Sequence, residues 1–288
     1  MSNFVLMTDS CCDLSAAMAD ELNLSVLPLS VIQEGKEYRN FLDNRELDPK
    51  EFYARLREGA MGSTSAANVD AFRTAMEPIL KDGKDILCLA FSGALSTTYQ
   101  SAVIAGKELE EEYPARKIIV IDTLCASLGQ GMLVWLAGQE QQKGKSIDEV
   151  AAYVRETIPH LCHFFTVNDL NHLKRGGRVS ATTALVGSML QIKPILHVDD
   201  EGRLISIGKA RGRKASIAAL LDKIEELCTD TEHFFISHGD CQNEVDEMAA
   251  QIKERFGAKD VTINFVGPVI GNHTGSGVIA LFFLGKHR

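Results

Sequence analysis

Short apolar runs alternate with amphipathic segments through the first half of the chain. The apolar runs predict buried strands over residues 4–9, 25–32, 86–91 and 117–122. The segments between and after them have apolar positions at helical spacing and predict helices over residues 14–22, 48–58, 68–81, 97–113, 127–143 and 143–159, the last beginning at the cap residue Ser146. Strands that alternate with helices in this order indicate βαβ units and a mainly parallel sheet.

The pattern changes near residue 160. The second half predicts strands over residues 162–167, 193–199, 203–210, 233–238, 261–266 and 278–284, with helices over 213–228 and 242–256. The strands on either side of residues 200–202 are joined by an acid–glycine turn, which favours a hairpin. We therefore expect an α/β protein of two lobes: an N-terminal lobe over residues 1–160 with a mainly parallel sheet flanked by helices, and a C-terminal α+β lobe over residues 161–288.

Length and charge support two domains and restrict the partners. A chain of 288 residues with 45% hydrophobic residues exceeds what one core usually organises. The net charge of −9 makes a nucleic-acid partner unfavourable, because phosphate binding needs a basic face. The N-terminus lacks the pattern of a signal peptide, and no apolar stretch approaches the length of a membrane span, so we expect a soluble, cytoplasmic protein without stable membrane insertion.

The seven cysteines do not have the spacing of a metal site. No C-x-x-C pair occurs, and most of the cysteines stand beside apolar residues. These features predict buried thiols in a reducing compartment rather than disulfides or zinc ligands.

Small polar residues follow the ends of several predicted strands. They form three clusters, at residues 8–10, 62–65 and 92–99, each close to the start of a predicted helix. In an open α/β sheet, ligands bind beyond the carboxyl ends of the strands, where hydroxyls and free N–H groups suit an anion. Helix capping alone is the simpler interpretation of any one cluster.

The segment 267–277 is rich in glycine and predicts a loop that turns tightly or approaches another group closely. His273 stands in its middle and is able to hydrogen-bond a carboxylate, although a loop histidine is often only solvated. Residues 275–280 match G-x-G-x-x-A, but a strand-like run follows instead of a helix, so we reject a dinucleotide site.

Cationic residues surround two glycine turns. Arg175 and Arg178 flank the first and Arg211 lies at the second, and each could be solvated surface, a phosphate contact or a docking site for an acidic partner. No P-loop motif and no G-x-S-x-G nucleophile elbow is present. A stand-alone serine esterase or transferase that uses Ser92 or Ser96 with His273 stays open as the alternative function.

Seven strings, in order, resemble the DegV family of bacterial fatty-acid-binding proteins, which includes the FakB subunits of fatty acid kinase. They are TDSCCDLS (8–15), TSAAN (64–68), ALSTTYQSA (94–102), IDTLCASLGQG (121–131), LKRGGRVS (173–180), KPIL (193–196) and GPVIGNHTGSG (267–277). Each string alone is weak, but together they cover nearly the whole chain. Three positions depart from the family pattern: Ala66-Ala67 replaces x-Pro, Thr97 replaces a glycine and Asn272 replaces a threonine.

The resemblance implies a buried long-chain fatty acid of the palmitate type, C14–C18, and no cofactor or metal. By motif match, its carboxylate is held by Thr64, Ser96 and His273, with Ser65 and Ser92 as neighbours. In relatives the two RGGR arginines, here Arg175 and Arg178, lie near the head-group entrance, where a separate ATP-dependent kinase forms an acyl phosphate; Arg211 belongs to the second cationic group. The resemblance thus implies a lipid-binding protein that presents its ligand, not an enzyme acting alone.

Burial of the acyl chain supplies enough free energy for such a carrier. About 14 methylenes at ~0.8 kcal/mol each give roughly 11 kcal/mol before the costs of ordering. We therefore expect the tail to supply most of the affinity and the head-group hydrogen bonds to fix orientation.

Overall fold

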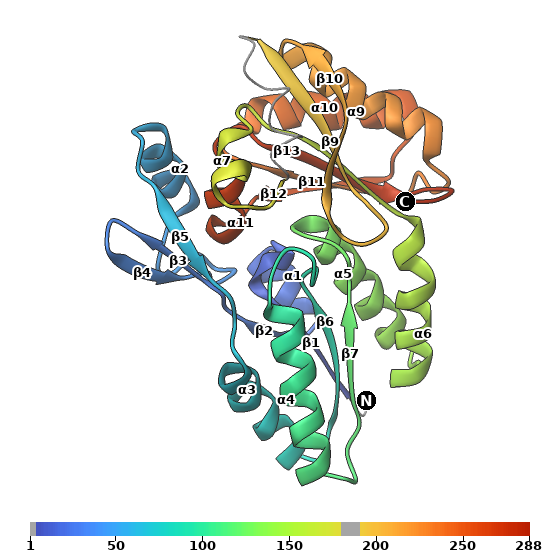
Figure 1. The fold of residues 1–288 in the computed structure, drawn as a ribbon. Helices are drawn as coiled ribbons and strands as arrows, with labels where there is room; N and C mark the ends of the chain where they lie inside the picture. Colours follow the sequence, from blue (N-terminus) through green and yellow to red (C-terminus); the bar gives the residue numbers. More distant parts are fainter. Residues whose placement is uncertain (1–3, 180–190) are drawn as a thin grey trace.

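The computed structural model describes residues 4–179 and 191–288, which form three sheets (Figure 1). The first sheet is wholly parallel. The strand order is β2-β1-β6-β7. The strands are β1 (Phe4–Asp9), β2 (Ser25–Leu27), β6 (Asp85–Ala90) and β7 (Ile118–Asp122). This sheet confirms the parallel arrangement that the alternating pattern predicts.

Helices cover both faces of this sheet because its strands are apolar on both sides. Leu6 and Leu89 belong to one core, under α5 (Leu128–Gln142) and α6 (Ile147–Thr157), whereas Met7 and Cys88 belong to the other, under α3 (Val69–Lys81) and α4 (Thr98–Glu112). Successive residues of a strand point to opposite faces, so a continuous apolar run fills both cores. The helices of this part of the chain are α1 (Ala16–Glu21), α3 (Val69–Lys81), α4 (Thr98–Glu112), α5 (Leu128–Gln142) and α6 (Ile147–Thr157), with the 3-10 turns η1 (Ser10–Cys12) and η2 (Ile158–His160). The predicted start of α6 at Ser146 is confirmed by a capping box with Glu149.

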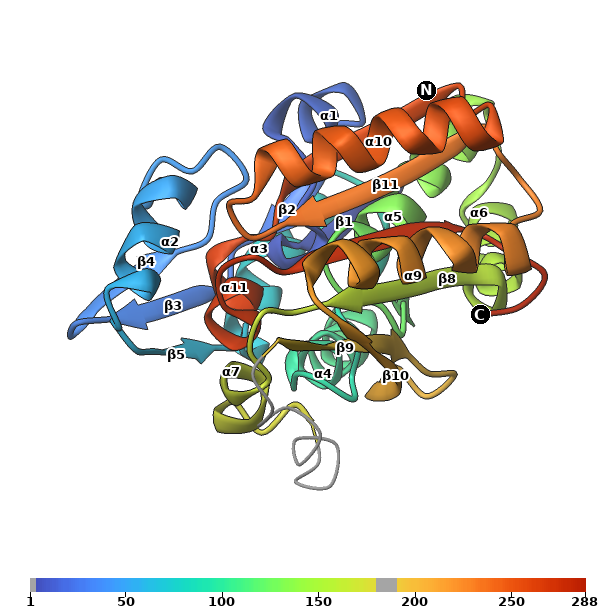
Figure 2. The ribbon, with the colours of Figure 1, turned by 90° about the horizontal axis from the view of Figure 1, so that it is seen from above.

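The second sheet is mixed and has the strand order β10-β9-β8-β13-β11-β12. Its strands are β8 (Leu161–Thr166), β9 (Ile192–Val198), β10 (Leu204–Arg211), β11 (His233–His238), β12 (Asp260–Phe265) and β13 (Ile279–Leu284). Among the described strand pairs of this sheet, only β11–β12 is parallel, and β9 and β10 form the predicted hairpin. Helices α9 (Arg213–Leu227) and α10 (Gln242–Phe256) cover its outer face, and its inner face is turned toward α5 (Figures 1 and 2). The predicted α/β class, with a parallel sheet followed by a mixed C-terminal sheet, is confirmed; the boundary at residue 160 stays a prediction.

A third, three-stranded sheet was not expected. It contains β3 (Ser30–Gln33), β4 (Lys36–Arg39) and β5 (Gly62–Ser65), and it carries helix α2 (Pro49–Arg57). The single strand predicted over 25–32 is wrong: the chain is interrupted at residues 28–29, and β2 and β3 join different sheets. Pro28 accounts for the break, since it has no N–H to donate to a ladder.

The glycine-rich segment 267–277 is also a correction. It is not a loop: residues Pro268–Thr274 form helix α11, and the short helix α7 (Asn171–Arg175) lies beside it (Figure 1). Pro268 stands in the first turn, where its missing N–H costs nothing, and Gly275 ends the helix with a φ of 78°. Gly271 has a packing role, because a Cβ there would lie 2.6 Å from the hydroxyl oxygen of Tyr53.

Two further properties agree with the composition. All seven cysteines are free thiols, and five of them are buried. Within residues 4–179 and 191–288, no helix is both long and apolar enough to cross a bilayer.

Candidate functional site

A cavity of about 360 Å³ lies beneath the inner face of the mixed sheet. Its walls come from the mixed sheet, from the loops that follow β6 and β7, from β5 of the three-stranded sheet and from α11. Most of the lining is apolar, and the side chains Leu29, Phe91, Leu95, Phe165, Leu204, Val269, Ile270 and Ala280 form much of it. A volume of this size is within the range of small-molecule sites. The lining therefore suits an apolar ligand.

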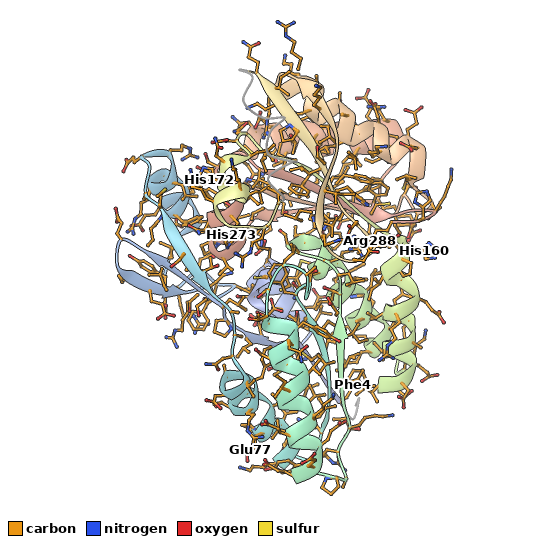
Figure 3. The ribbon with its side chains drawn as sticks, in the orientation of Figure 1. Phe4, Glu77, His160, His172, His273 and Arg288 are labelled. Atoms are coloured by element: carbon orange, nitrogen blue, oxygen red, sulfur yellow. The ribbon has the colours of Figure 1, made fainter. Side chains whose placement is uncertain are left out.

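One end of the cavity is polar and is built by two distant segments. The Thr64 hydroxyl oxygen lies 2.9 Å from Nε2 of His273, although the two residues are 209 positions apart. Thr64 is on β5 and His273 is on α11, and both line the cavity. Figure 3 shows His273 on the side of the molecule where the three-stranded sheet lies. The fold thus brings together two of the three residues that the motifs predict at the head group.

The imidazole of His273 is neutral at physiological pH. Burial is the main cause that lowers its pKa to about 4, and the nearby positive charge of Arg178 contributes to the same shift. Nδ1 of His273 is buried without a hydrogen-bond partner among the described residues. A neutral imidazole carries one proton, on either Nδ1 or Nε2. An N–H at the buried Nδ1 would have no acceptor, so we place the proton on Nε2, where it is donated to the Thr64 hydroxyl oxygen.

Ser96 and Ser65 also line the cavity, and Ser96 lies at the start of α4. The Ser96 hydroxyl oxygen accepts a hydrogen bond from the Thr98 backbone N–H (3.2 Å) and lies 2.8 Å from the Thr98 hydroxyl oxygen. Its bond to Thr98 orients the hydroxyl at the helix N-terminus, where partial positive charge favours an anion.

Ser92 is placed differently from the other predicted residues. It is completely buried, its hydroxyl donates to the carbonyl oxygen of Gly202 (2.9 Å), and it is not among the lining residues of the cavity in the described chain. Its hydroxyl therefore ties the β9–β10 hairpin to the loop after β6. Among the described residues, His273 is hydrogen-bonded to Thr64, and no hydrogen bond joins it to Ser92 or Ser96.

The three predicted arginines occupy three different environments. Arg178 lines the cavity, and its Nε donates to the backbone carbonyl of Leu95 (3.3 Å). Arg175 lines a second cavity of about 300 Å³, which shares Thr64, Arg178 and His273 with the first. Arg211 is exposed at the end of β10 and lines neither cavity. The RGGR motif therefore lies at the polar end of the cavity. Ser180, the last residue of the matched string 173–180, lies outside the described residues.

Sequence reasoning missed several polar residues of the lining, including Thr274. Ser127, Ser237 and His163 line the cavity and are buried. Ser127 and Ser237 have hydroxyl oxygens 2.8 Å apart, and the Ser127 hydroxyl donates to the Asp13 carboxylate (2.5 Å). Burial raises the pKa of Asp13 to about 7, and the bond from Ser127 opposes this effect. Asp13 and Ser127 belong to two of the matched strings, but nothing in the strings places their side chains against each other.

These features define a class of protein: an α/β protein with a parallel sheet and a mixed sheet, and a mainly apolar cavity with hydroxyl groups and an imidazole at one end. The family described as "Uncharacterised protein, DegV family COG1307" matches residues 3–286. A DegV domain-containing protein of Clostridium perfringens (strain 13 / Type A) is 47% identical over 290 residues, covering 100% of this chain and 99% of that protein. The chain belongs to the DegV family.

Solved structures of relatives have the same fold. A DegV family protein from Thermus thermophilus, described by its fatty acid binding, has a TM-score of 0.88 and 30% identity, covering 98% of this chain and 99% of that chain. A protein from Thermotoga maritima, whose structure is described as revealing a fatty acid binding function, has a TM-score of 0.82 and 28% identity, covering 98% of this chain and 99% of that chain.

Proposed function

We propose that this protein binds a long-chain fatty acid of C14–C18 in the cavity, with the carboxylate at Thr64, Ser96 and His273. The observation that carries the proposal is the Thr64–His273 hydrogen bond at the polar end of an otherwise mainly apolar cavity. The fatty acid binding described for the relatives from T. thermophilus and T. maritima supports it.

The hydrogen bonds at the polar end suit a carboxylate. With its proton on Nε2, His273 donates to the Thr64 hydroxyl oxygen, which leaves the Thr64 proton free to be donated to the ligand. Ser65 lies beside Thr64, and Ser96 adds a hydroxyl at the N-terminus of α4. Arg178 supplies a positive charge at the same end of the cavity, which adds to the hydrogen bonds from these neutral groups.

The lipid carried by the protein as purified tests this function. We expect mass spectrometry of the denatured protein to release close to one C14–C18 fatty acid per chain. A hydrolase or transferase would be isolated without stoichiometric lipid and would turn over an activated ester. Protein that is empty and does not take up added fatty acid would contradict the proposal.

Gly176 gives a direct probe of the His273 position. A Cβ at residue 176 would overlap Nδ1 of His273, whereas the φ of −70° at this residue is compatible with alanine. We expect Gly176→Ala to displace the imidazole, break its bond to Thr64 and weaken fatty acid binding about tenfold. Titration of delipidated protein measures this effect. Gly208→Ala is the matched control, since its Cβ would meet only Ile195 at 3.8 Å; equal affinities of both variants and the wild type would contradict the assigned role of His273.

We further propose that the protein acts in the cytoplasm and presents the bound acid to a separate ATP-dependent fatty acid kinase. The second cavity supports this, because it shares Thr64 and His273 with the lipid cavity and adds Arg175. Positive charge beside the carboxylate suits the phosphate groups of a donor held by another protein. Incubation of loaded protein with such a kinase and ATP, followed by trapping with hydroxylamine, tests it; hydroxamate should form only when all three are present.

A further inference from the structure

His163 places a polar ring inside the apolar part of the cavity. It lies on β8, whose alternate residues His163 and Phe165 face the cavity. The side chain is surrounded by aromatic rings, with centroid distances of 4.5 Å to Phe282 and 5.8 Å to Phe165. The residue is 4% exposed, and its Nδ1 has no hydrogen-bond partner among residues 4–179 and 191–288. An unsatisfied buried nitrogen of this kind is uncommon in folded proteins and calls for an explanation.

The His163 ring lies well away from the carboxylate end. His163 pairs with Phe282 on β13, three residues beyond Ile279, where that strand begins. At ~3.3 Å per residue, this register places His163 about 10 Å along β13 from its first residue, and α11 with His273 precedes that residue in the chain.

Two serines, Ser127 and Ser237, add polar groups to the cavity wall between the carboxylate end and His163. Ser237 pairs with Ala280 on β13, so it lies nearer to the head-group end than His163 does. Ser127 and Ser237 are hydrogen-bonded to each other (2.8 Å), and Ser127 is also hydrogen-bonded to the Asp13 carboxyl group (2.5 Å), so both hydroxyl oxygens keep lone pairs that are able to accept. Part of the cavity wall beyond the head group therefore consists of hydrogen-bonding groups.

An unsubstituted alkyl chain leaves the His163 imidazole without a partner. Burial lowers the pKa of His163 well below its usual range, so the ring is neutral and has one N–H donor and one bare nitrogen acceptor. Nδ1 is inaccessible and faces α5, where a Cβ at Gly129 would lie 3.4 Å from it, so Nε2 is the nitrogen that a ligand in the cavity reaches. A hydroxyl group both donates and accepts, so it would bond Nε2 in either tautomer.

We propose that the cavity selects acyl chains that carry a hydroxyl group in the half remote from the carboxylate, with His163 as the residue that receives it. This inference rests on the proposed function and names a substrate class for the same cavity: hydroxylated long-chain fatty acids. The specificity arises because only the hydroxylated chain pairs a polar group that the protein has already buried.

Competition between matched ligands tests the proposal. Delipidated wild-type protein is titrated with octadecanoic acid and with a series of hydroxyoctadecanoic acids that differ in the position of the hydroxyl. We expect one position in the remote half to bind about tenfold more tightly than octadecanoic acid. His163→Leu should remove this preference and bind octadecanoic acid at least as tightly as the wild type. His160→Leu, an exposed site outside the cavity lining, is the control and should keep the preference.

The outcomes separate this inference from the function on which it rests. If the wild type binds octadecanoic acid but binds every hydroxylated chain equally or more weakly, the inference is overturned and the fatty acid function stands; a water molecule bound at His163 would give this result. If no fatty acid binds at all, the proposed function itself fails. The wild-type series decides the matter even if His163→Leu does not fold.

Discussion

Ala280→Phe is expected to abolish fatty acid binding while the protein remains folded. Ala280 lines the cavity from the middle of the mixed sheet, between Phe165 and Ser237 on the neighbouring strands. A phenyl ring there would occupy space that we assign to the acyl chain. Exclusion of about six methylenes at ~0.8 kcal/mol each removes about 5 kcal/mol, which corresponds to more than a thousandfold in affinity.

Stability is measured together with binding to exclude a trivial loss through unfolding. Filling an existing cavity adds apolar contacts, so we expect the unfolding midpoint of the lipid-free variant to equal or exceed that of the lipid-free wild type. Ala17→Phe, on the exposed face of α1, makes the same substitution away from the cavity and should retain lipid. Stoichiometric lipid in folded Ala280→Phe would show that the acyl chain lies elsewhere.

Thr64→Val is expected to weaken binding about 10- to 150-fold without changing the shape of the site. Valine replaces the hydroxyl by a methyl group, so the variant loses the bond to the carboxylate and the 2.9 Å bond to His273. Hydrogen bonds to charged groups contribute about 1.5–3 kcal/mol each, which gives this range. Equilibrium titration of the delipidated variant with a C16 or C18 acid measures the loss.

Conservative and distant substitutions make this test specific. Thr64→Ser keeps the hydroxyl and should recover most of the affinity. Thr262→Val, on β12 and outside the cavity lining, makes the same chemical change and should have no effect. A Thr64→Val protein with wild-type affinity would mean that the carboxylate is held by other groups.

Much of the fold could be predicted because apolar periodicity follows burial. The strand predicted over 4–9 is confirmed as β1, and the predicted hairpin is confirmed as β9–β10. The prediction failed for segments that are paired or packed in the structure but lack the apolar spacing of a strand or a helix. β5 has the sequence GSTS, with no apolar residue, so it resembles a loop although it pairs along its length with β3. α11 contains one glycine and one proline and is capped by a glycine at each end, and its helical state depends on packing against α2 and α7.

The site could be predicted only in part. Family motifs point to Thr64 and His273, and the structure places them in contact, but their binding of a carboxylate stays a prediction. Ser92 lies in the same motif region as Ser96, yet its hydroxyl is committed to Gly202, which depends on a hairpin 110 residues away. His163 stands in the apolar run of β8, where the sequence alone does not distinguish a cavity wall from a packed core.

A crystal structure of the protein with bound octadecanoic acid tests the central claim most directly. We predict continuous acyl density along Phe165 and Ala280, with one carboxylate oxygen within hydrogen-bonding distance of the Thr64 hydroxyl. A chain bound in the reverse direction, with its carboxylate at His163, or a cavity that contains only water, would contradict the account.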